Sequence, residues 1–294
     1  MSATQNEVSE KTINQANRPT TSRTVTRPNS FIFTLYGDFV HRDPALAEEL
    51  WVGSIIRLMS QFEISEQAVR QGVSRMSRQG WLTARKHGPR SYYALTDRGR
   101  TRIETISPRI YGPLVEWDGN WRVLTYAVSE RNREGRDRLR KDLTVLGWAP
   151  LSASTWISPN ADLEAARGAA QADGVLTDVD LFAAAHRGPR SDRELVERCW
   201  NVPEIAERYR AFIASYRPRL DGERLREPLA DREAFVERMW LVHDFRKFTY
   251  LDPGLPSALL PPHWPGTAAT ALFRTYYAAL APKAQRFFTQ ALQS

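Results

Sequence analysis

The amino-acid sequence of 294 residues predicts an α+β protein built from three consecutive domains. Three observations indicate this class. Residues 28–110 show helical periods followed by one short hairpin, residues 111–188 alternate strand and helix patterns, and residues 189–294 have helical periods almost throughout. Residues 1–27 contain few apolar side chains, so we expect them to form a disordered tail.

The first domain is expected to contain three helices and a hairpin. Residues 31–40 and 51–62 repeat apolar side chains at helical spacing, and residues 65–79 form the clearest helical period of the chain. Residues 81–95 then change to two short β-rich runs around a His-Gly-Pro turn. Three helices followed by such a hairpin predict a winged helix-turn-helix, in which the hairpin is the wing.

The ends of the third helix are marked by residues that favour helix termini. Ser65 can cap the helix by accepting a hydrogen bond from a backbone amide, and Gly80 can adopt the left-handed conformation that stops it. After the hairpin, Thr96 is expected to cap a further helix that ends near Pro108. The sequence therefore predicts both ends of the third helix and the start of the helix that follows the hairpin.

The positive charge of the chain is concentrated in this segment. Residues 66–102 contain nine Lys or Arg and two acids, a difference of 9 − 2 = +7, which equals the formal charge of the whole chain. This concentration is typical of proteins that bind the phosphates of nucleic acid. The expected DNA-binding residues are, on the polar face of the helix, Gln67, Arg70, Gln71, Ser74, Arg75 and Arg78, and, on the hairpin, Arg85, Lys86, His87 and Arg90. The alternative is an ordinary solvated helix in a basic protein.

The second domain is expected to be a small β-α-β-β-α-β unit of the ferredoxin-like type. Residues 121–128 predict a strand, and the helix that follows sets Leu139, Leu143 and Leu146 on one stripe. Residues 149–158 predict one strand or a tight pair of strands. A second helix over residues 161–174 and a closing strand over residues 179–185 complete the pattern.

The third domain should be helical, with the Pro-rich residues 251–266 as its longest interruption. No stretch is long and apolar enough for a transmembrane helix, and the N-terminus lacks the apolar core of a signal peptide, so we expect a soluble, cytoplasmic protein without a membrane partner. The single cysteine, Cys199, excludes a disulfide within the chain and a thiolate cluster for zinc.

No common catalytic motif stands out in the sequence. The sequence has no Gly-rich phosphate loop, no G-x-S-x-G and no H-E-x-x-H, and its five histidines have no metal partner at a recognisable spacing. We therefore expect no enzymatic activity, no catalytic residue, no metal site and no cofactor.

Four segments resemble the PaaX family, the bacterial repressors of phenylacetic acid degradation. They are FIFTLYGDFV, GSIIRLMSQFEISEQAVRQGVSRMSRQGWL, RSYYALTDRGR and FRKFTYLDPGLPSALLPPHWPG, and the resemblance runs from about Pro28 to the C-terminus. It implies a GntR-like winged helix, a middle domain similar to the small ferredoxin-like nucleases of CRISPR systems, and a helical C-terminal domain for effector binding and dimerisation. It also implies a homodimer that represses an operon and leaves its operator DNA when it binds an aryl-CoA thioester such as phenylacetyl-CoA.

The resemblance directs attention to one segment that could bind such an effector. An acyl-CoA carries phosphates and an apolar acyl end, so its site needs basic side chains beside an aromatic wall. The candidate effector residues are Trp240, His243, Phe245, Arg246 and Lys247. The alternative is a helix that packs Trp240 inward and leaves Arg246 and Lys247 solvated.

Three other functions stay open from the sequence. The protein could regulate another aromatic pathway and sense a free aromatic compound, it could be a metal-dependent nucleic-acid enzyme of the middle domain, or it could bind DNA without sequence preference. The CRISPR nucleases hold their metal with an aspartate near the end of the first strand. Here that position reads Tyr126-Ala127-Val128-Ser129, so nuclease activity is not expected.

Overall fold

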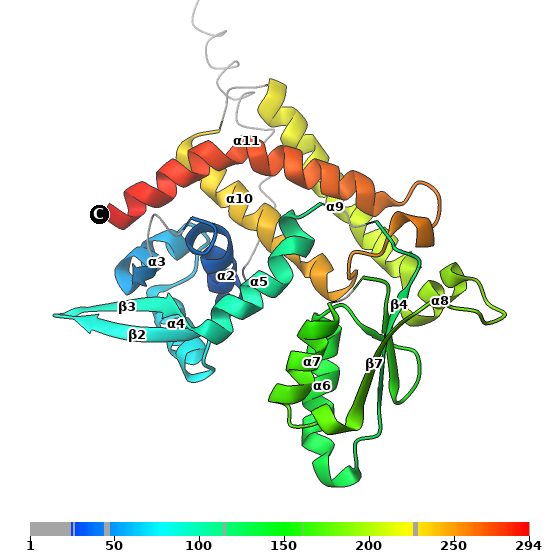
Figure 1. Cartoon of the computed structure of the whole chain (residues 1–294). Helices are drawn as coiled ribbons and strands as arrows, with labels where there is room; N and C mark the ends of the chain where they lie inside the picture. The colour runs from blue at the N-terminus through cyan, green and yellow to red at the C-terminus, as the bar shows by residue number, and fades with distance from the viewer. Residues whose placement is uncertain are drawn as a thin grey trace, which may run out of the picture.

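The computed structural model describes residues 25, 27–43, 48–113, 116–160, 162–225 and 229–293. The expected disordered tail, residues 1–27, lies outside the described residues except for Val25 and Arg27. Figure 1 shows the N-terminal elements on the left, the middle elements at the lower right, and the C-terminal helices across the top of both. The chain is a mixed α and β protein with two small sheets, which agrees with the predicted combination of helices and strands.

The N-terminal region contains a short sheet enclosed by helices. Its β-strands pair antiparallel in the order β1-β3-β2. The elements are α2 (Pro28–Leu35), the π-helix η1 (Tyr36–Val40), β1 (Glu49–Trp51), α3 (Val52–Ser60), α4 (Glu66–Arg78), β2 (Leu82–His87), β3 (Arg90–Leu95) and α5 (Asp97–Tyr111).

Three details of this region differ from the expectation. The helix expected over residues 31–40 is an α-helix that continues as one π-helical turn. Strand β1 was not predicted, because a strand of three residues has no period to read. Helix α5 runs through Pro108 instead of ending there. A proline removes one backbone hydrogen-bond donor from a helix. Contacts of the last turn, such as the hydrogen bond from Tyr111 Oη to Asp38 Oδ1 at 2.9 Å, keep this turn helical.

The middle region is a four-stranded sheet with two helices. Its strands pair antiparallel in the order β5-β6-β4-β7, so residues 149–158 form a tight pair of strands, which was one of the two predicted alternatives. The elements are β4 (Trp121–Tyr126), the 3-10 turn η2 (Glu130–Asn132), α6 (Arg133–Val145), β5 (Ala149–Pro150), β6 (Thr155–Ser158), α7 (Leu163–Ala172), the 3-10 turn η3 (Leu176–Asp178) and β7 (Val179–Ala184).

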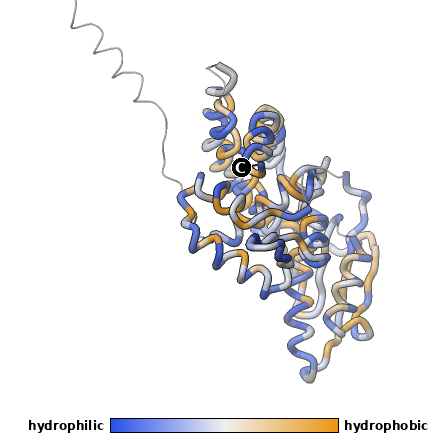
Figure 2. The backbone as a smooth tube through the Cα atoms, turned by 90° about the vertical axis from the view of Figure 1, so that its left-hand side faces the viewer, coloured by the Kyte–Doolittle hydropathy of each residue, from blue (hydrophilic) through white to orange (hydrophobic). Residues whose placement is uncertain are grey.

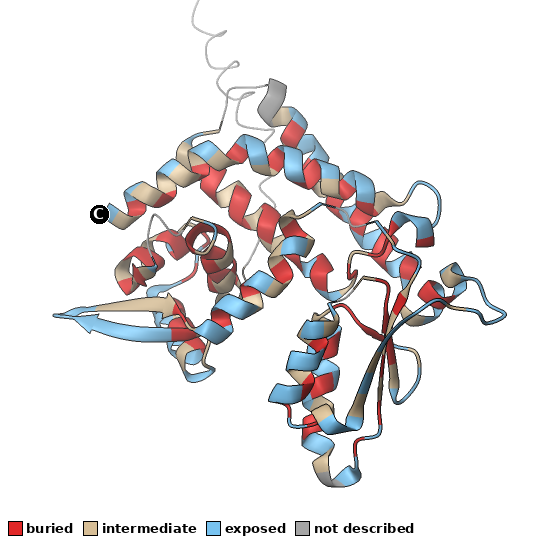
Figure 3. Cartoon of the chain, viewed as in Figure 1, coloured by how far each residue is buried: buried red, intermediate tan, exposed pale blue. Residues whose placement is uncertain are grey.

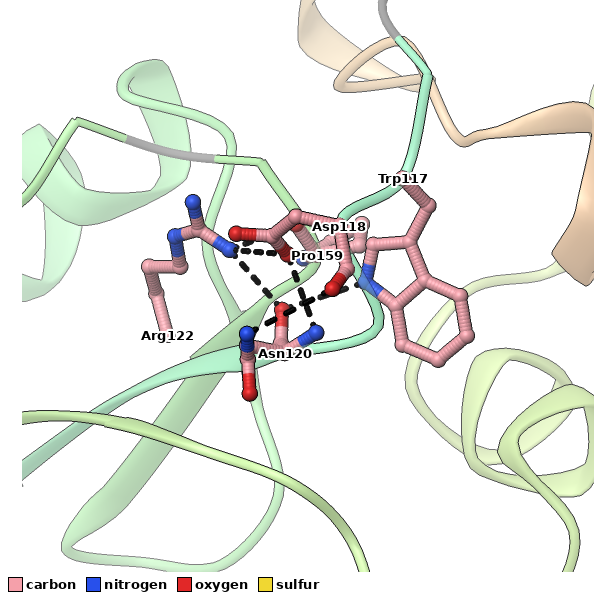
Figure 4. Close-up of polar contacts among 5 residues, drawn as sticks. All are labelled: Trp117, Asp118, Asn120, Arg122 and Pro159. Atoms are coloured by element: carbon pink, nitrogen blue, oxygen red, sulfur yellow. Dashed lines mark hydrogen bonds and ion pairs between the residues drawn. The ribbon is translucent and has the colours of Figure 1, made fainter.

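The turn into β4 is held by a compact polar cluster, drawn in Figure 4. Arg122 donates to Asp118 Oδ1 at 2.7 Å and to the Asn120 carbonyl at 2.9 Å, and Trp117 Nε1 donates to the same carbonyl at 3.1 Å. The Arg122 hydrogen bond and the Asn120 amide lower the pKa of Asp118 to about 2, although this carboxylate is exposed. Gly119, at the tip, has a φ of 81°, a conformation that glycine adopts without strain.

The C-terminal region is helical, as its periods predicted. Helix α10 lies beside α11 and also packs against α2 of the N-terminal region. The elements are α8 (Asp192–Cys199), α9 (Val202–Leu225), α10 (Asp231–Phe245), the 3-10 turns η4 (Arg246–Tyr250) and η5 (Ser257–Leu259), and α11 (Pro265–Gln293). Among the described residues, no helix is long and apolar enough to cross a membrane.

Two hydrophobic cores hold the molecule together. The larger contains side chains of both the N-terminal and the C-terminal regions, whereas the smaller lies inside the middle region between its sheet and helices α6 and α7. Figure 2 shows hydrophobic and hydrophilic residues alternating along the helices, as expected where one face turns toward a core. The N-terminal and C-terminal regions therefore share a core, to which Trp121, Ala149 and Ile157 of the middle region also belong.

Candidate DNA-binding surface and ligand cavity

Helix α4 presents a polar face to solvent because its apolar residues lie on the opposite side. Val69, Val73 and Met76 are buried. Ser65 Oγ accepts a hydrogen bond from the amide of Ala68 at 3.2 Å, and Gly80 has a φ of 74°, so both predicted ends of the helix are confirmed. The six residues expected on its polar face are all exposed: Gln67, Arg70, Gln71, Ser74, Arg75 and Arg78.

The cations on this face differ in what they contact. Arg70 forms an ion pair with Glu66, one turn earlier, at 2.8 Å. The side chains of Arg75 and Arg78 form no hydrogen bond or ion pair with any other described residue. Because a guanidinium has five donors in a planar fork, these two side chains are available to an external acceptor such as a phosphate or a purine edge.

The hairpin β2-β3 extends beyond the helices and carries the second set of expected DNA contacts (Figure 1). Arg85, Lys86, His87 and Arg90 are exposed. Glu49 lies 3.9 Å from Arg85 and 3.7 Å from His87, and the Arg90 guanidinium lies 4.5 Å from the centre of the Trp51 ring. Such exposed contacts contribute little stability, but they orient the basic side chains of the hairpin.

Four of the five candidate effector residues line one cavity. It has a volume of about 520 Å³, and its walls include Trp240, His243, Arg246 and Lys247. Residues that sequence reasoning missed complete it, namely Val25, Arg27, Ser30 and Tyr250. Phe245 is not part of this cavity, because it is 4% exposed and packs against Phe273 with their ring centres 4.1 Å apart.

Arg246 is neither solvated nor fully paired. It is 7% exposed, and one terminal nitrogen donates to the Ser30 carbonyl at 2.9 Å and to the Ser30 hydroxyl. Its Nε is buried without a hydrogen-bond partner among the described residues. Burial lowers the pKa of Arg246, while the interaction with Tyr250 opposes this shift, and the unpaired buried Nε remains a cost in free energy.

His243 joins α10 to α2. Its Nδ1 lies 3.1 Å from the hydroxyl of Thr34, and that hydroxyl also donates to the Ser30 carbonyl at 3.1 Å. Because a hydroxyl has one hydrogen, Nδ1 must carry the proton and donate to Thr34. Burial, with Arg246 and Lys247 nearby, lowers the pKa of His243 to about 3, which keeps the ring neutral.

A buried polar cluster around Asp38 was also missed. Arg238 Nε donates to Asp38 Oδ2 at 2.8 Å, and Tyr111 and Tyr277 each donate to Asp38 Oδ1 at 2.9 Å. Burial first, and then the Asp38 charge, raise the pKa of both tyrosines. The four residues come from η1, α5, α10 and α11. They lie far apart in the sequence, so no local sequence pattern predicted the cluster.

A larger cavity of about 890 Å³ lies where the three regions meet. Its lining includes the stacked rings of Tyr209 and Phe248, whose centres are 4.0 Å apart, together with Trp264. The Tyr209 hydroxyl donates to the buried carboxylate of Asp252 at 2.9 Å. The Pro-rich residues 251–266 supply much of the cavity wall. The only sequence feature that pointed to this wall was the break in helical periodicity over these residues.

Comparison with known proteins places the chain in a family. Three family models match it: PaaX-like protein over residues 27–99, the PaaX protein central Cas2-like domain over residues 114–196, and the PaaX-like protein C-terminal domain over residues 200–290. The chain is 32% identical to the transcriptional repressor PaaX of Escherichia coli K12 over 272 residues, which cover 89% of this chain and 83% of that protein.

A solved structure shares the fold. The uncharacterized protein Rv0674 from Mycobacterium tuberculosis matches with a TM-score of 0.51 and 24% sequence identity, over 90% of this chain and 99% of that one. The three matching family models and the extent of the similarity to the Escherichia coli repressor lead to one conclusion, that this chain belongs to the PaaX family.

Proposed function

We propose that this protein is a DNA-binding transcriptional repressor of an operon for the degradation of an aromatic acid of the phenylacetate type. The observation that carries the proposal is the polar face of α4, where the exposed side chains of Arg75 and Arg78 form no hydrogen bond or ion pair with another described residue. The similarity to the Escherichia coli repressor supports it. A repressor acts on the chromosome, so the proposal places the protein in the cytoplasm.

The proposal assigns a role to each region. Residues 28–110 are taken as a winged helix-turn-helix, with α3 and α4 as the two helices and β2-β3 as the wing. Residues 111–188 are taken as a ferredoxin-like domain, because the order β5-β6-β4-β7 with two covering helices is that of a β-α-β-β-α-β unit. Residues 189–294 are taken as the effector and dimerisation domain.

On DNA, α4 lies in the major groove and the wing contacts the adjacent backbone. A fluorescence anisotropy titration with the DNA upstream of the operon tests this. The double variant Arg75→Ala, Arg78→Ala should bind at least about thirtyfold more weakly, since each bidentate contact contributes about 1–3 kcal/mol and two contribute at least about 2 kcal/mol. Arg140→Ala, which removes an exposed arginine from α6 in the middle region, is the matched control. Unchanged operator affinity in the folded double variant would overturn this placement.

The same titration distinguishes a repressor from a nuclease. A repressor binds DNA in EDTA and leaves it intact with Mg²⁺ or Mn²⁺, whereas a metal-dependent enzyme cuts the duplex only when the metal is present. In this chain β4 is followed by Ala127, Val128 and Ser129, and none of these can supply a carboxylate ligand. Cleavage that depends on added metal would contradict the repressor proposal.

The effector is proposed to be an aryl-CoA thioester that binds in the 520 Å³ cavity. Arg27, Arg246 and Lys247 supply positive charge, although Lys247 is also paired with Asp244 at 2.8 Å, and Trp240 supplies an aromatic wall. No acid is among the described residues that line the cavity. This combination suits a ligand that carries both phosphates and an aromatic group.

The cavity is connected to α4 by direct contacts. Arg246 holds Ser30 on α2, and a Cβ added to Gly72 of α4 would lie 3.0 Å from Ile32 and 3.1 Å from Asn29, both on α2. Helices α2 and α4 therefore pack too closely to move independently. An anion that draws Arg246 away from Ser30 releases α2 and shifts α4 on the DNA. A hundredfold release requires about 2.7 kcal/mol of difference in ligand affinity between the two arrangements.

Effector release is tested by titrating the operator complex with phenylacetyl-CoA, phenylacetate and CoA. Release by the thioester alone is the expected result. The variants Arg27→Ala and Lys247→Ala remove exposed cations from the cavity wall and should raise the thioester concentration needed for release, whereas Arg140→Ala should not. If only free phenylacetate or another free aromatic acid acts, the thioester proposal fails and the repressor proposal stands.

The repressor is proposed to act as a homodimer. Each chain has one α4, which covers one half-site, and two copies related by a dyad read a pseudo-palindrome. Sedimentation analysis at micromolar concentration should give twice the chain mass of 33.6 kDa. A monomer that binds the full operator with one protein per duplex would exclude the dimer.

A further inference from the structure

The hairpin β2-β3 has almost no core of its own, so its orientation depends on contacts at its base. In these two strands only Leu82 and Leu95 are buried, and they pair with each other at the end of the hairpin next to the helices. Figure 3 shows the rest of the hairpin in the colours of exposed and intermediate residues. Strand β3 is held by its pairing with β1, whereas β2 is joined to α4 by residues 79–81. This turn therefore helps to set the direction of the hairpin relative to α4.

The turn of residues 79–81 lies against the first turn of α5. Gly80 has a φ of 74°, and glycine restricts the backbone less than any other residue. Thr96, which caps α5, donates from its hydroxyl to the Gly80 carbonyl at 2.6 Å and from its amide to the Trp81 carbonyl at 3.1 Å. A Cβ added to Gly99 would lie 2.4 Å from the Trp81 carbonyl oxygen, so α5 and the turn are in direct contact. Side chains of α5 can therefore fix the conformation of this turn.

Arg98, in the first turn of α5, contacts both ends of the 79–81 turn. Its Nη1 donates to the carbonyl of Gln79, the residue that caps the end of α4, at 3.0 Å. Its guanidinium carbon lies 4.3 Å from the centre of the Trp81 ring, immediately before β2. The ring of Phe33 on α2 meets the Trp81 ring edge-on, with 6.1 Å between their centres. One side chain thus links the end of α4 to the start of the hairpin.

This arrangement uses two properties that arginine has and lysine lacks. A guanidinium can stack on an aromatic ring while its edge donates hydrogen bonds. Carbonyls at the C-terminal end of a helix carry partial negative charge and have no partner within the helix, so the Gln79 carbonyl is a favourable acceptor for a cation. The contacts of Arg98 therefore depend on the shape of its side chain as well as on its charge.

We propose that Arg98 is a positioning residue for DNA recognition, which fixes the direction of the wing relative to α4 and does not neutralise a DNA phosphate. The inference rests on the proposed DNA binding by α4 and the wing, and it separates Arg98 from the cations of residues 66–102 that are proposed to contact DNA. A misdirected wing cannot contact the duplex while α4 occupies its site. Binding to random DNA depends mainly on the number of cations and tolerates such a change.

Exchange of Arg98 for alanine and for lysine separates positioning from phosphate contact. Both variants should weaken operator binding about fivefold, because lysine keeps the charge but not the planar fork. Binding of Arg98→Lys to a random duplex of the same length should change by less than about twofold. At the proposed phosphate contact Arg85, lysine should recover most of the affinity that Arg85→Ala loses, since charge is what that contact requires. Arg140→Ala should bind the operator like the wild type.

The salt dependence of binding gives a second readout. Arg98→Ala should reduce the slope of log affinity against log salt by less than about half a unit, because no phosphate contact is lost. Arg90→Ala, on the wing, should reduce the same slope by about one unit.

A double-variant cycle tests the contact with Trp81. Trp81→Leu should weaken operator binding, and adding Arg98→Ala should weaken it by less than about twofold more, because both substitutions remove the same contact. Far-UV circular dichroism checks that the variants are folded. If Trp81→Leu does not fold, the comparison of Arg98→Lys on operator and random DNA decides the proposal.

The outcomes separate the positioning role from the repressor proposal. Operator affinity at the wild-type level in Arg98→Lys, equal losses on operator and random DNA in that variant, or a salt slope reduced by one unit in Arg98→Ala would each overturn the positioning role. The repressor proposal still stands in these cases if Arg75→Ala, Arg78→Ala loses operator binding. A wild-type protein that shows no preference for the operator overturns both proposals.

Discussion

Helices α4 and α10 both carry arginines, and the structure uses them in opposite ways. On α4, the side chains of Arg75 and Arg78 are exposed and form no hydrogen bond or ion pair with another described residue, whereas Arg238 on α10 is 4% exposed and paired with Asp38. Helix α4 packs one face inward, while α10 lies between α2 and α11 and is covered around most of its circumference. The role of an arginine is therefore decided by what surrounds its helix.

The difference also depends on where the carboxylates lie. Helix α4 has no acid after Glu66, so its remaining cations have no partner on their own face. Arg238 receives its partner from η1, 200 positions earlier in the chain. A buried guanidinium is stable only when a carboxylate and further hydrogen bonds compensate for its lost hydration. Helix α4 thus exposes its charge to solvent, while α10 uses a buried charge to join two regions.

The largest expected effect comes from removing the buried pair. Asp38→Ala leaves Arg238 buried without its partner and should lower the free energy of unfolding by about 3–5 kcal/mol, measured by chemical denaturation. The control is Asp97→Ala, because Asp97 is fully exposed and lies 3.6 Å from Arg100; its loss should change stability by less than about 0.5 kcal/mol. Equal losses of stability in the two variants would contradict the distinction between buried and exposed charge pairs.

The next effect concerns the presented charge of α4. Arg75→Ala should weaken operator binding by about 1–3 kcal/mol and relax the preference at one defined base pair, because Arg75 is proposed to contact a base edge. The free energy of unfolding of this variant should stay within about 0.5 kcal/mol of the wild-type value. Competition between operators with single base changes measures the preference. A variant that loses affinity equally for every sequence would show that Arg75 contacts phosphate instead.

A smaller effect is expected from pH at the contact between α10 and α2. The pKa of His243 is lowered from 6.5 to about 3, so the unfolded chain binds a proton that the folded chain excludes between these values. This contribution to stability is complete above about pH 6.5 and should fall by about 1 kcal/mol on acidification to about pH 5.5. His243→Asn keeps a donor for Thr34 and removes the titration, so denaturation curves of this variant should lose that part of the pH dependence. An identical pH profile in both proteins would contradict a buried neutral ring.

The smallest effect is expected on the wing. Arg90 stacks on Trp51 and is proposed to contact phosphate, so Arg90→Ala should weaken binding to all duplexes alike and reduce the slope of log affinity against log salt by about one unit. The comparison with Arg75→Ala is made on the same set of operators. A loss confined to the operator sequence would assign Arg90 to base reading.

Sequence reasoning predicted the parts of the fold that depend on neighbouring residues. Ser65 and Gly80 marked the ends of α4, and the spacing of Val69, Val73 and Met76 defined which face is buried. Strand β1 and the passage of α5 through Pro108 were not predicted, since pairing and packing with distant residues stabilise them. For the candidate effector site, the residue types could be chosen from one segment of α10 and η4, while the opposite wall, with Arg27 and Ser30, could not.

The sequence by itself determined the α+β class, the exposed basic face of α4, the basic hairpin and the membership of the PaaX family. The class, the helix face and the hairpin follow from local spacing and composition, which act between residues a few positions apart, whereas the family membership follows from sequence similarity along the chain. Only the tertiary structure decided that Arg238 and Arg246 are buried, that Phe245 faces a different cavity from Trp240, and that Arg98 contacts the end of α4. The physical reason is that burial, pairing and desolvation depend on which distant segments come together, and a period along one helix carries no information about its neighbours.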